Sequence, residues 1–365
     1  MRFSLAPLFV SGLAVLLVAC DNHSSVDARS QAAATKNSLQ TPEHVYAHPP
    51  LVTHIYTADP AAHVFNGRIY IYPSHDIESD IPANDAGDHF AMRDYRVLSM
   101  AAPGGEVTDH GVALDIAGIP WAGRQLWAPD AAEKDGLFYL YFPVKDHQDI
   151  FRIGVAVSDK PEGPFTNPQP IEGAWSNDPA VYQDEKGHYY LYTGGISGGQ
   201  LQRWTQGRFA EHDQYPADDQ PALLPKIARL NDDMVSLAEP LTDVPLLDAS
   251  GQPLLAGDRE RRFFEGVWVH RYQNTYYFSW STGDTHKIAY ATGDNPYGPF
   301  TYRGVLLEPV TGWTTHHSII SFNDQWYLFY HDSSLSGGQT HLRSIKMTPL
   351  NHRDDGSIET ISAFR

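Results

Sequence analysis

The sequence is short of cysteine and of positive charge, and both shortages exclude classes of protein. Cys20 is the single cysteine among 365 residues, so no intramolecular disulfide and no cysteine-based structural zinc site can form. Lysine and arginine number 26 against 44 acidic residues, which gives a net charge of −18 at pH 7. Such an acidic protein is not expected to bind nucleic acid or an anionic membrane surface.

Long apolar runs are also missing, apart from one near the N-terminus. That run covers residues 5–19, follows Arg2, and is interrupted by Pro7 and Gly12, so it is typical of a secretory signal rather than a membrane span. It ends at Leu17-Val18-Ala19-Cys20, which resembles the bacterial lipoprotein box. The resemblance implies a signal peptide over 1–19 and a lipid on Cys20. We therefore expect a lipid-anchored protein of the bacterial cell envelope that faces the periplasm or the cell surface.

Residues 20–50 carry no apolar period and are rich in Ser, Ala, Gln, Asn and Thr, which indicates a flexible tether. The remainder, 51–365, is expected to form one folded domain. Apolar residues make up 42 % of the chain, so a sizeable core can form. Aromatic residues reach 12 %, with 29 glycines and 26 prolines, a composition that favours short strands and many turns over helices.

One phrase, a turn followed by an aromatic-rich strand, recurs five times at 67–72, 136–141, 187–192, 274–279 and 324–330. Each copy is preceded by a run that starts with a polar residue and is followed by another strand-like run. Repetition of this kind predicts an all-β, five-bladed β-propeller. A β-sandwich is the alternative, but it would not repeat the same phrase five times. The longest interruption, 206–262, is expected to hold two outer strands of the third blade, 226–230 and 234–237.

The first strand of each propeller blade lines the central channel, and all five run in the same direction. Residues at the starts of these strands therefore face one mouth of the channel, and here they are Asp59, Asp130, Asp178, Glu265 and His317. Gathering four carboxyls raises their pKa values and costs stability, so such clusters are usually functional. They could cage a hard cation such as calcium. Alternatively, they could perform acid–base chemistry on a glycosidic bond.

Aromatic residues near these positions favour the second interpretation, because their rings can stack on sugar faces. The alternative is that these rings only pack in the core. They are Phe90, Trp121, Trp127 and Trp313. Two segments, 76–94 and 110–126, are expected to close the far side of the sugar pocket. The first is long enough to block one end, which favours exo action.

Several phrases at these positions resemble glycoside hydrolase family 43, and the resemblance spans about 53–347. They are Thr57-Ala58-Asp59-Pro60, Leu126-Trp127-Ala128-Pro129-Asp130, Asn177-Asp178-Pro179, Phe264-Glu265-Gly266 and His316-His317-Ser318-Ile319. The family consists of five-bladed propellers that act on xylan- and arabinan-type chains with inversion. Asp59 matches its general base, Glu265 its general acid, and Asp178 the carboxylate that holds the acid and raises its pKa.

The resemblance also implies supporting residues. Trp127 and Asp130 would line the sugar pocket, Arg343 would contact sugar hydroxyls, and His317 would contact substrate or serve as the one protein ligand of a hydrated calcium ion. No cofactor is implied beyond this possible structural ion. The expected partner is an oligosaccharide, with membrane contact only through the lipid.

The expected reaction is release of xylose or L-arabinofuranose from xylan- or arabinan-type oligosaccharides, with β-xylosidase favoured. The alternatives are an α-L-arabinofuranosidase or an arabinanase and, more remotely, a non-catalytic sugar-binding propeller. A phosphorylase or transglycosidase would need several basic residues beside the acids, and the sequence shows no such cluster.

Overall fold

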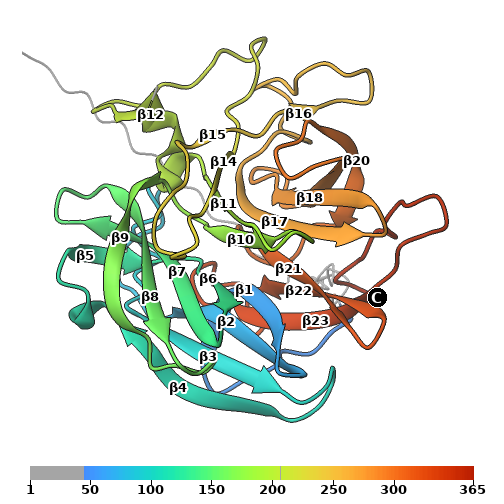
Figure 1. The fold of residues 1–365 in the computed structure, drawn as a ribbon. Coiled ribbons are helices and arrows are strands. Elements are labelled where there is room, and N and C mark those ends of the chain that lie inside the picture. Colours follow the sequence, from blue (N-terminus) through green and yellow to red (C-terminus); the bar gives the residue numbers. More distant parts are fainter. Residues whose placement is uncertain (1–44, 206) are drawn as a thin grey trace, which may run out of the picture. The chain divides into compact units, whose positions relative to one another are not determined.

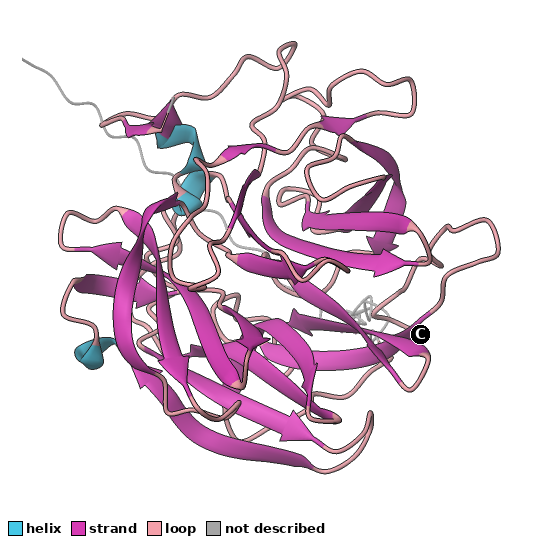
Figure 2. Cartoon of the chain, viewed as in Figure 1, coloured by secondary structure: helices cyan, strands magenta, loops and turns pink. Residues whose placement is uncertain are grey.

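A computed structural model describes residues 45–205 and 207–365. The predicted signal peptide, Cys20 and most of the tether lie outside these residues. Within them the chain is almost entirely β-strand (Figure 2). Its helices there are three short 3₁₀ turns: η1 (Ile116–Gly118), η2 (Ser197–Gly199) and η3 (Leu201–Arg203). No helix in the described part of the chain is long and apolar enough to cross a membrane.

The first two blades are antiparallel sheets of four and five strands. Blade one contains β1 (Tyr56–Phe65), β2 (Arg68–Asp76), β3 (Asp94–Met100) and β4 (Val107–Asp115). Blade two contains β5 (Ala122–Leu126), β6 (Asp130–Lys134), β7 (Leu137–Asp146), β8 (Phe151–Ser158) and β9 (Thr166–Trp175), with β5 and β6 both paired to β7.

The third blade contains the long interruption. Its strands are β10 (Ala180–Gln183), β11 (Tyr189–Thr193), β14 (Lys226–Arg229) and β15 (Thr242–Asp243), and β12 (Trp204–Thr205) pairs separately with β13 (Arg208–Phe209). The predicted strand at 226–230 is thus present. The one at 234–237 is wrong, because the carboxylate of Asp233 accepts the backbone N–H groups of Val235 and Ser236 and folds the segment into a tight turn.

The last two blades complete the ring. Blade four contains β17 (Glu265–Tyr272), β18 (Thr275–Ser281), β19 (Ile288–Gly293) and β20 (Phe300–Leu307), joined in parallel by β16 (Leu246–Leu247). Blade five contains β21 (His317–Phe322), β22 (Gln325–Asp332) and β23 (Ser344–Leu350). The innermost strands β1, β6, β10, β17 and β21 each contact the next, and β21 contacts β1 again (Figure 1). This closed ring confirms the predicted five-bladed propeller.

The repeated aromatic phrase links each blade to a neighbouring segment. It places one fully buried tyrosine on the second strand of every blade: Tyr72, Tyr141, Tyr192, Tyr277 and Tyr330. Four of these hydroxyls donate to a backbone carbonyl of a distant loop, at Pro161, Met234, Pro296 and Gly356, over 2.6–2.8 Å. The fifth, from Tyr330, lies 2.7 Å from Nδ1 of His48. A buried phenol needs such a partner. We call each contact a tyrosine latch, because the ring packs within its own blade while its hydroxyl is hydrogen-bonded to another segment.

The segment before β1 is hydrogen-bonded to the last blade and to the C-terminal segment. Val45 and Ala47 exchange backbone hydrogen bonds with Arg365 and Ala363, and the N–H of Leu51 donates to Ile345 in β23. Residues 45–50 were predicted to belong to the tether. That boundary is wrong, because their backbone groups pair with the last blade and the C-terminal segment.

Candidate active site

The starts of the inner strands surround a pocket of about 480 Å³. Its lining includes all three predicted catalytic carboxyls, Asp59, Asp178 and Glu265. It also includes four of the other residues singled out from the sequence: Phe90, Trp127, Trp313 and Arg343. The structure therefore brings together, at one end of the channel, side chains from all five blades and their loops.

Local backbone irregularity turns the carboxyls toward this pocket. Asp59 has φ of 50° and sits in a bulge of β1, and Asp178 has φ of 49° just before β10. Glu265 starts β17, where Gly266 has φ of 69° and the register with β18 shifts. Bulges and left-handed residues re-aim side chains at strand ends, and here they coincide with the three acids.

Asp59 is held as a carboxylate. Its Oδ1 accepts from Nη1 of Arg343 at 2.9 Å, and its Oδ2 accepts from the hydroxyl of Ser74 at 2.6 Å. Burial alone would raise the pKa of Asp59. The charge of Arg343, the neighbouring histidines and the Ser74 hydrogen bond outweigh burial and lower that pKa to about 2.

The histidine beside Asp59 is fixed in one tautomer. The backbone N–H of Asp59 donates to Nδ1 of His331 at 2.9 Å, so Nδ1 is unprotonated and the ring proton lies on Nε2. Nε2 lies 3.1 Å from the carbonyl of Thr314 and donates to it. Burial and the charge of Arg343 lower the pKa of His331 to about 3, so the ring is neutral at any working pH. His331 orients Asp59 without exchanging protons.

Asp178 and Glu265 differ from Asp59, because their pKa values are raised rather than lowered. Burial raises the pKa of both carboxyls, and the charge of Asp59 raises both further. Asp178 accepts N–H donors on both oxygens, from Gly266 at 2.9 Å and from Asn177 at 2.9 Å. The carboxyl of Glu265 accepts no hydrogen bond from the described residues. We assign the shared proton to Glu265, because two N–H donors stabilise the anion of Asp178 and none stabilises that of Glu265.

Arg343 holds two of the buried carboxylates in place. Its Nε and Nη2 bind the two oxygens of Asp76 at 2.8 and 2.7 Å, and its Nη1 binds Asp59. The guanidinium also lies 4.9 Å from the ring centre of Phe90. The second Nη1 hydrogen is donated to the hydroxyl of Thr314 at 3.2 Å, so four of the five N–H groups are used and one Nη2 hydrogen is left for a ligand. Its predicted contact with sugar hydroxyls stays a prediction.

The wall around Trp127 is rigid. The indole Nε1 donates to the carbonyl of Phe90 at 2.9 Å, and Arg124 binds Asp88 of the same loop at 2.7 Å. A Cβ at Gly87 would lie 2.6 Å from the indole, and one at Gly198 would lie 2.8 Å from it. The predicted role of 76–94 is thus seen in the pocket. The predicted role of 110–126 is not, since the rest of the wall comes from 196–198 and 313–316.

Three predicted sugar-site residues lie elsewhere. Asp130 is 1 % exposed, and its oxygens accept from the backbone N–H of Val181 and bind Nε2 of His63, each at 2.6 Å. Trp121 stacks on Phe142 outside the pocket. The prediction that Asp130 lines the pocket is wrong, because protein groups already occupy its oxygens. For Trp121 the structure gives the packing alternative, since its ring lies against Phe142.

His317 is also absent from the lining. It is fully buried, and its Nε2 lies 2.6 Å from the hydroxyl of Ser279. A direct sugar contact by His317 is therefore wrong. Among residues 45–205 and 207–365, no group of three or more His, Cys, Asp or Glu is placed to hold a metal ion, so the four-acid cation cage has no support there.

His316 is the residue that the sequence reasoning missed. It lines the pocket, and neither ring nitrogen has a hydrogen-bond partner within the described part of the chain. Its Nε2 lies 3.9 Å from Asp178, and burial lowers its pKa, so the ring is neutral. Alternation along a strand could have shown that only one of two adjacent histidines faces the mouth.

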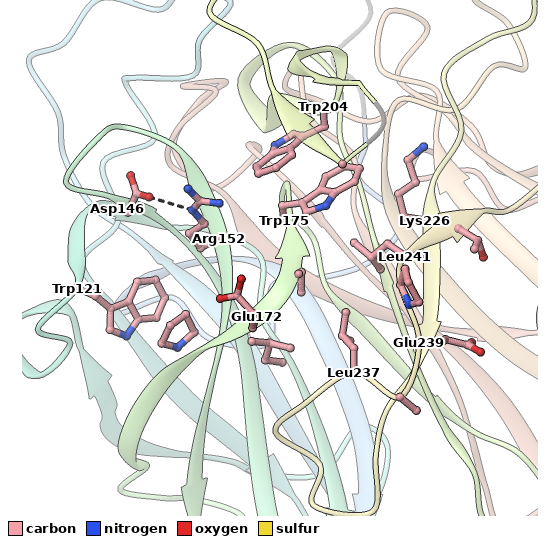
Figure 3. Close-up of a pocket in the computed structure, with 18 of the residues that line it drawn as sticks. Trp121, Asp146, Arg152, Glu172, Trp175, Trp204, Lys226, Leu237, Glu239 and Leu241 are labelled. Carbon is pink, nitrogen blue, oxygen red and sulfur yellow. Dashed lines mark hydrogen bonds and ion pairs between the residues drawn. The ribbon is translucent and has the colours of Figure 1, made fainter.

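A larger groove of about 1330 Å³ lies on the outside of blades two and three (Figure 3). Trp175 and Trp204 stack there with ring centres 4.6 Å apart. Arg152 binds Asp146 at 2.9 Å, and Lys226 pairs with Asp243. None of the three catalytic-candidate carboxyls lines this groove, so volume alone does not identify the site.

Comparison with known proteins agrees with this geometry. The sequence matches the glycosyl hydrolases family 43 over residues 57–358. A xylosidase/arabinosidase of Bacteroides ovatus is 57 % identical over 85 % of this chain and 96 % of its own length. A beta-xylosidase of Xylanibacter ruminicola is 48 % identical over 84 % and 97 %.

Solved structures also match this chain. A GH43 beta-xylosidase/alpha-arabinofuranosidase from a compost microbial metagenome, in complex with xylotriose and calcium-free, is 66 % identical with a TM-score of 0.86, covering 87 % of this chain and 98 % of that one. A GH43_1 enzyme of Xanthomonas citri complexed with xylose is 59 % identical with a TM-score of 0.84, covering 87 % and 94 %. The chain therefore belongs to glycosyl hydrolases family 43.

Proposed function

We propose that the protein is an exo-acting, inverting β-xylosidase that removes xylose from the end of xylan-type oligosaccharides. The observation that carries this proposal is the opposite setting of two carboxyls in one pocket. Asp59 is an anion with a pKa of about 2, whereas burial and Asp59 raise the pKa of Glu265 so that it keeps its proton. Glycosidic hydrolysis needs one ionised and one protonated carboxyl across the bond.

The residues would act in one displacement. Asp59 takes a proton from a water molecule, and the oxygen of that water attacks the anomeric carbon. Glu265 donates its proton to the leaving oxygen as the glycosidic bond breaks, so the product sugar has inverted configuration. Asp178 stays ionised and holds the proton on Glu265. His316 and the free N–H of Arg343 are suited to bind hydroxyls of the sugar at the cleavage point.

Exo action follows from the wall of the pocket. The loop around Asp88 is bound to Arg124, and Trp127 is fixed against it, so one side of the pocket is closed in the resting protein. A chain end can enter such a pocket, whereas the middle of a polymer cannot pass through it.

The second candidate is α-L-arabinofuranosidase activity. Its support is that relatives at 57 % and 56 % identity are called xylosidase/arabinosidase, the second from Humicola insolens. Arabinanase activity is less favoured, since an endo-arabinanase of Bacillus subtilis is 25 % identical over 46 % of this chain. A non-catalytic role is disfavoured because all three carboxyls are present.

The test is hydrolysis of aryl β-xyloside, α-L-arabinofuranoside and β-galactoside by the purified protein. The xyloside should be cleaved fastest, and proton NMR of the first turnovers should show the inverted anomer. A higher kcat/KM on the arabinofuranoside would favour the second candidate. Retained configuration would contradict the assignment of Asp59 as a base.

A calcium ion at His317 belongs to the same proposal. Nδ1 of His317 is buried without a hydrogen-bond partner among the described residues, which fits a hydrated ion held by one imidazole nitrogen and otherwise by water. Such an ion would supply positive charge inside the channel. Chelation should then lower the melting temperature, and calcium should restore it. An unchanged melting temperature would leave His317 as a hydrogen-bonded residue of the channel.

Lipid anchoring through Cys20, in a bacterial cell envelope, also remains part of the proposal. It is supported by the sequence Leu17-Val18-Ala19-Cys20. Protein with Cys20→Ala should lose its partition with membranes and keep its activity, because Cys20 precedes the propeller. Membrane association of that variant after a carbonate wash would contradict the lipid assignment.

A further inference from the structure

A second, smaller pocket adjoins the catalytic pocket. Its volume is about 270 Å³, and Ile196, Ser197, Phe264 and Asp284 line both pockets. The rest of its lining comes from 215–223 and 256–263, which lie in or directly beside the long interruption at 206–262. The four shared residues make the two pockets neighbouring compartments of one depression.

We infer that this second pocket binds the leaving part of the oligosaccharide, with Tyr215 as the stacking platform for the second sugar beyond the cleaved bond. The inference rests on the proposed function. Tyr215 is an exposed large aromatic residue, at 51 % exposure, and its hydroxyl lies 3.2 Å from the hydroxyl of Ser197 on the shared rim. An exposed ring with a fixed orientation, beside the exit of a sugar pocket, suits the apolar face of a pyranose.

The platform is built before any ligand arrives. Asp213 accepts from Nε of Arg203 at 2.6 Å and from Gln202 at 3.2 Å, and the N–H of Gln214 donates to the carbonyl of Gln202. These bonds fix the two residues directly before Tyr215. A ring already held in place loses little conformational freedom on binding, so its contact contributes to affinity.

The charges around this pocket favour a neutral ligand. Arg262 binds Asp284 at 2.7 Å, and Arg259 lies 3.8 Å from the same carboxylate. Asp218 adds a second negative charge, so two arginines face two aspartates. The side chain of Arg259 is 63 % exposed, and its N–H groups are open to sugar hydroxyls. A balanced set of this kind suits the hydroxyls of a xylose unit better than a phosphate or a uronate.

The order of the two pockets predicts which substrate is long enough to contact Tyr215. The first leaving sugar lies over the shared rim of Ser197 and Phe264, and the second reaches the far wall. Xylobiose has one leaving sugar, and xylotriose has two. Tyr215 therefore contributes to the specificity for xylotriose over xylobiose.

The experiment measures kcat/KM for xylobiose and xylotriose in the wild type, Tyr215→Ala, Tyr215→Phe and Leu255→Ala. Tyr215→Ala should lose about tenfold on xylotriose, and less than about twofold on xylobiose. Tyr215→Phe keeps the ring and should retain most of the xylotriose activity. Leu255 is exposed in the same interruption and does not line the pocket, so Leu255→Ala should match the wild type on both substrates.

The outcomes separate the two levels of the proposal. If wild-type protein cleaves both substrates and Tyr215→Ala changes them equally, or changes neither, the assignment of Tyr215 is wrong and the β-xylosidase proposal stands. If wild-type protein cleaves neither xylobiose nor aryl β-xyloside, the proposed function itself fails. Melting temperatures of the four proteins should agree, because Tyr215 is exposed.

Discussion

The catalytic pocket and the outer groove of blades two and three contain similar residue types and differ in how their charges are compensated. In the outer groove each cation has its own carboxylate at the surface, as in the pair Arg152–Asp146. In the catalytic pocket three enclosed carboxyls face one guanidinium, that of Arg343, which already binds Asp76. The groove is the larger of the two, at about 1330 Å³ against about 480 Å³.

Uncompensated charge therefore identifies the site better than size does. One guanidinium cannot neutralise Asp59, Asp178 and Glu265 together, so their pKa values diverge and their roles separate. The comparison can be tested by removing single members of each set.

The largest effect is expected from Asp59→Ala. Water must be activated whichever group leaves, so the loss in kcat should reach the upper part of the roughly 10²–10⁴ range on both natural oligosaccharides and dinitrophenyl xyloside. Steady-state kinetics on both substrates measures it. A loss confined to one of them would show that Asp59 is not the general base.

Glu265→Ala should lower kcat by a similar factor, but only on natural oligosaccharides. The leaving oxygen of an oligosaccharide needs a proton, and the expected loss there is on the order of 10²–10⁴. Dinitrophenolate leaves readily as an anion, so the loss on dinitrophenyl xyloside should be far smaller. Equal losses on both substrates would contradict the role of Glu265 as acid.

Asp178→Ala should have an intermediate effect on rate and a specific effect on pH dependence. Glu265 must be protonated to act, so its pKa sets the alkaline limb of the kcat/KM profile. Two nearby carboxyls raise each other's pKa, and without the negative charge of Asp178 the pKa of Glu265 falls. The alkaline limb should move to lower pH while the acid limb, set by Asp59, stays in place. An alkaline limb at its wild-type pH would exclude this role.

The smallest effect is expected in the outer groove. Arg152 is partly exposed, pairs with Asp146 and lies 5.4 Å from the ring centre of Trp204. Arg152→Ala should lower the free energy of unfolding by about 1 kcal/mol and change kcat/KM less than about twofold. Denaturant unfolding and xylobiose kinetics measure the two. A large loss of activity would show that the groove does take part in the reaction.

The fold and the three acids could be predicted because they recur in register. A repeated aromatic strand fixes where each blade begins, and Asp59, Asp178 and Glu265 occupy corresponding positions before it. Asp130 occupies the same position, yet His63 of blade one and the backbone of Val181 capture its carboxylate. Register therefore predicts position in a repeat. It does not predict which partners a neighbouring blade supplies.

Loops and single-residue alternation account for the other differences. Trp121 and Trp127 lie close in sequence, but only Trp127 faces the pocket, because its Nε1 is held by the carbonyl of Phe90. His316 and His317 are adjacent, and the first faces the pocket while the second faces Ser279. Side chains on a strand alternate, so an error of one residue exchanges the pocket residue with the buried one.

The five tyrosine latches have a consequence for cutting and rejoining the chain. Four of them end on a loop carbonyl, whereas the latch of Tyr330 ends on His48, which lies before the family match at 57–358. A fragment trimmed to that match would keep the three carboxyls and lose the hydrogen bond between Tyr330 and His48. The backbone of Arg365 bonds that of Val45, so a short linker could join these positions and new ends could be opened between other blades. In such a circular permutant, the hydrogen bond between Tyr330 and His48 would join two internal segments of the chain.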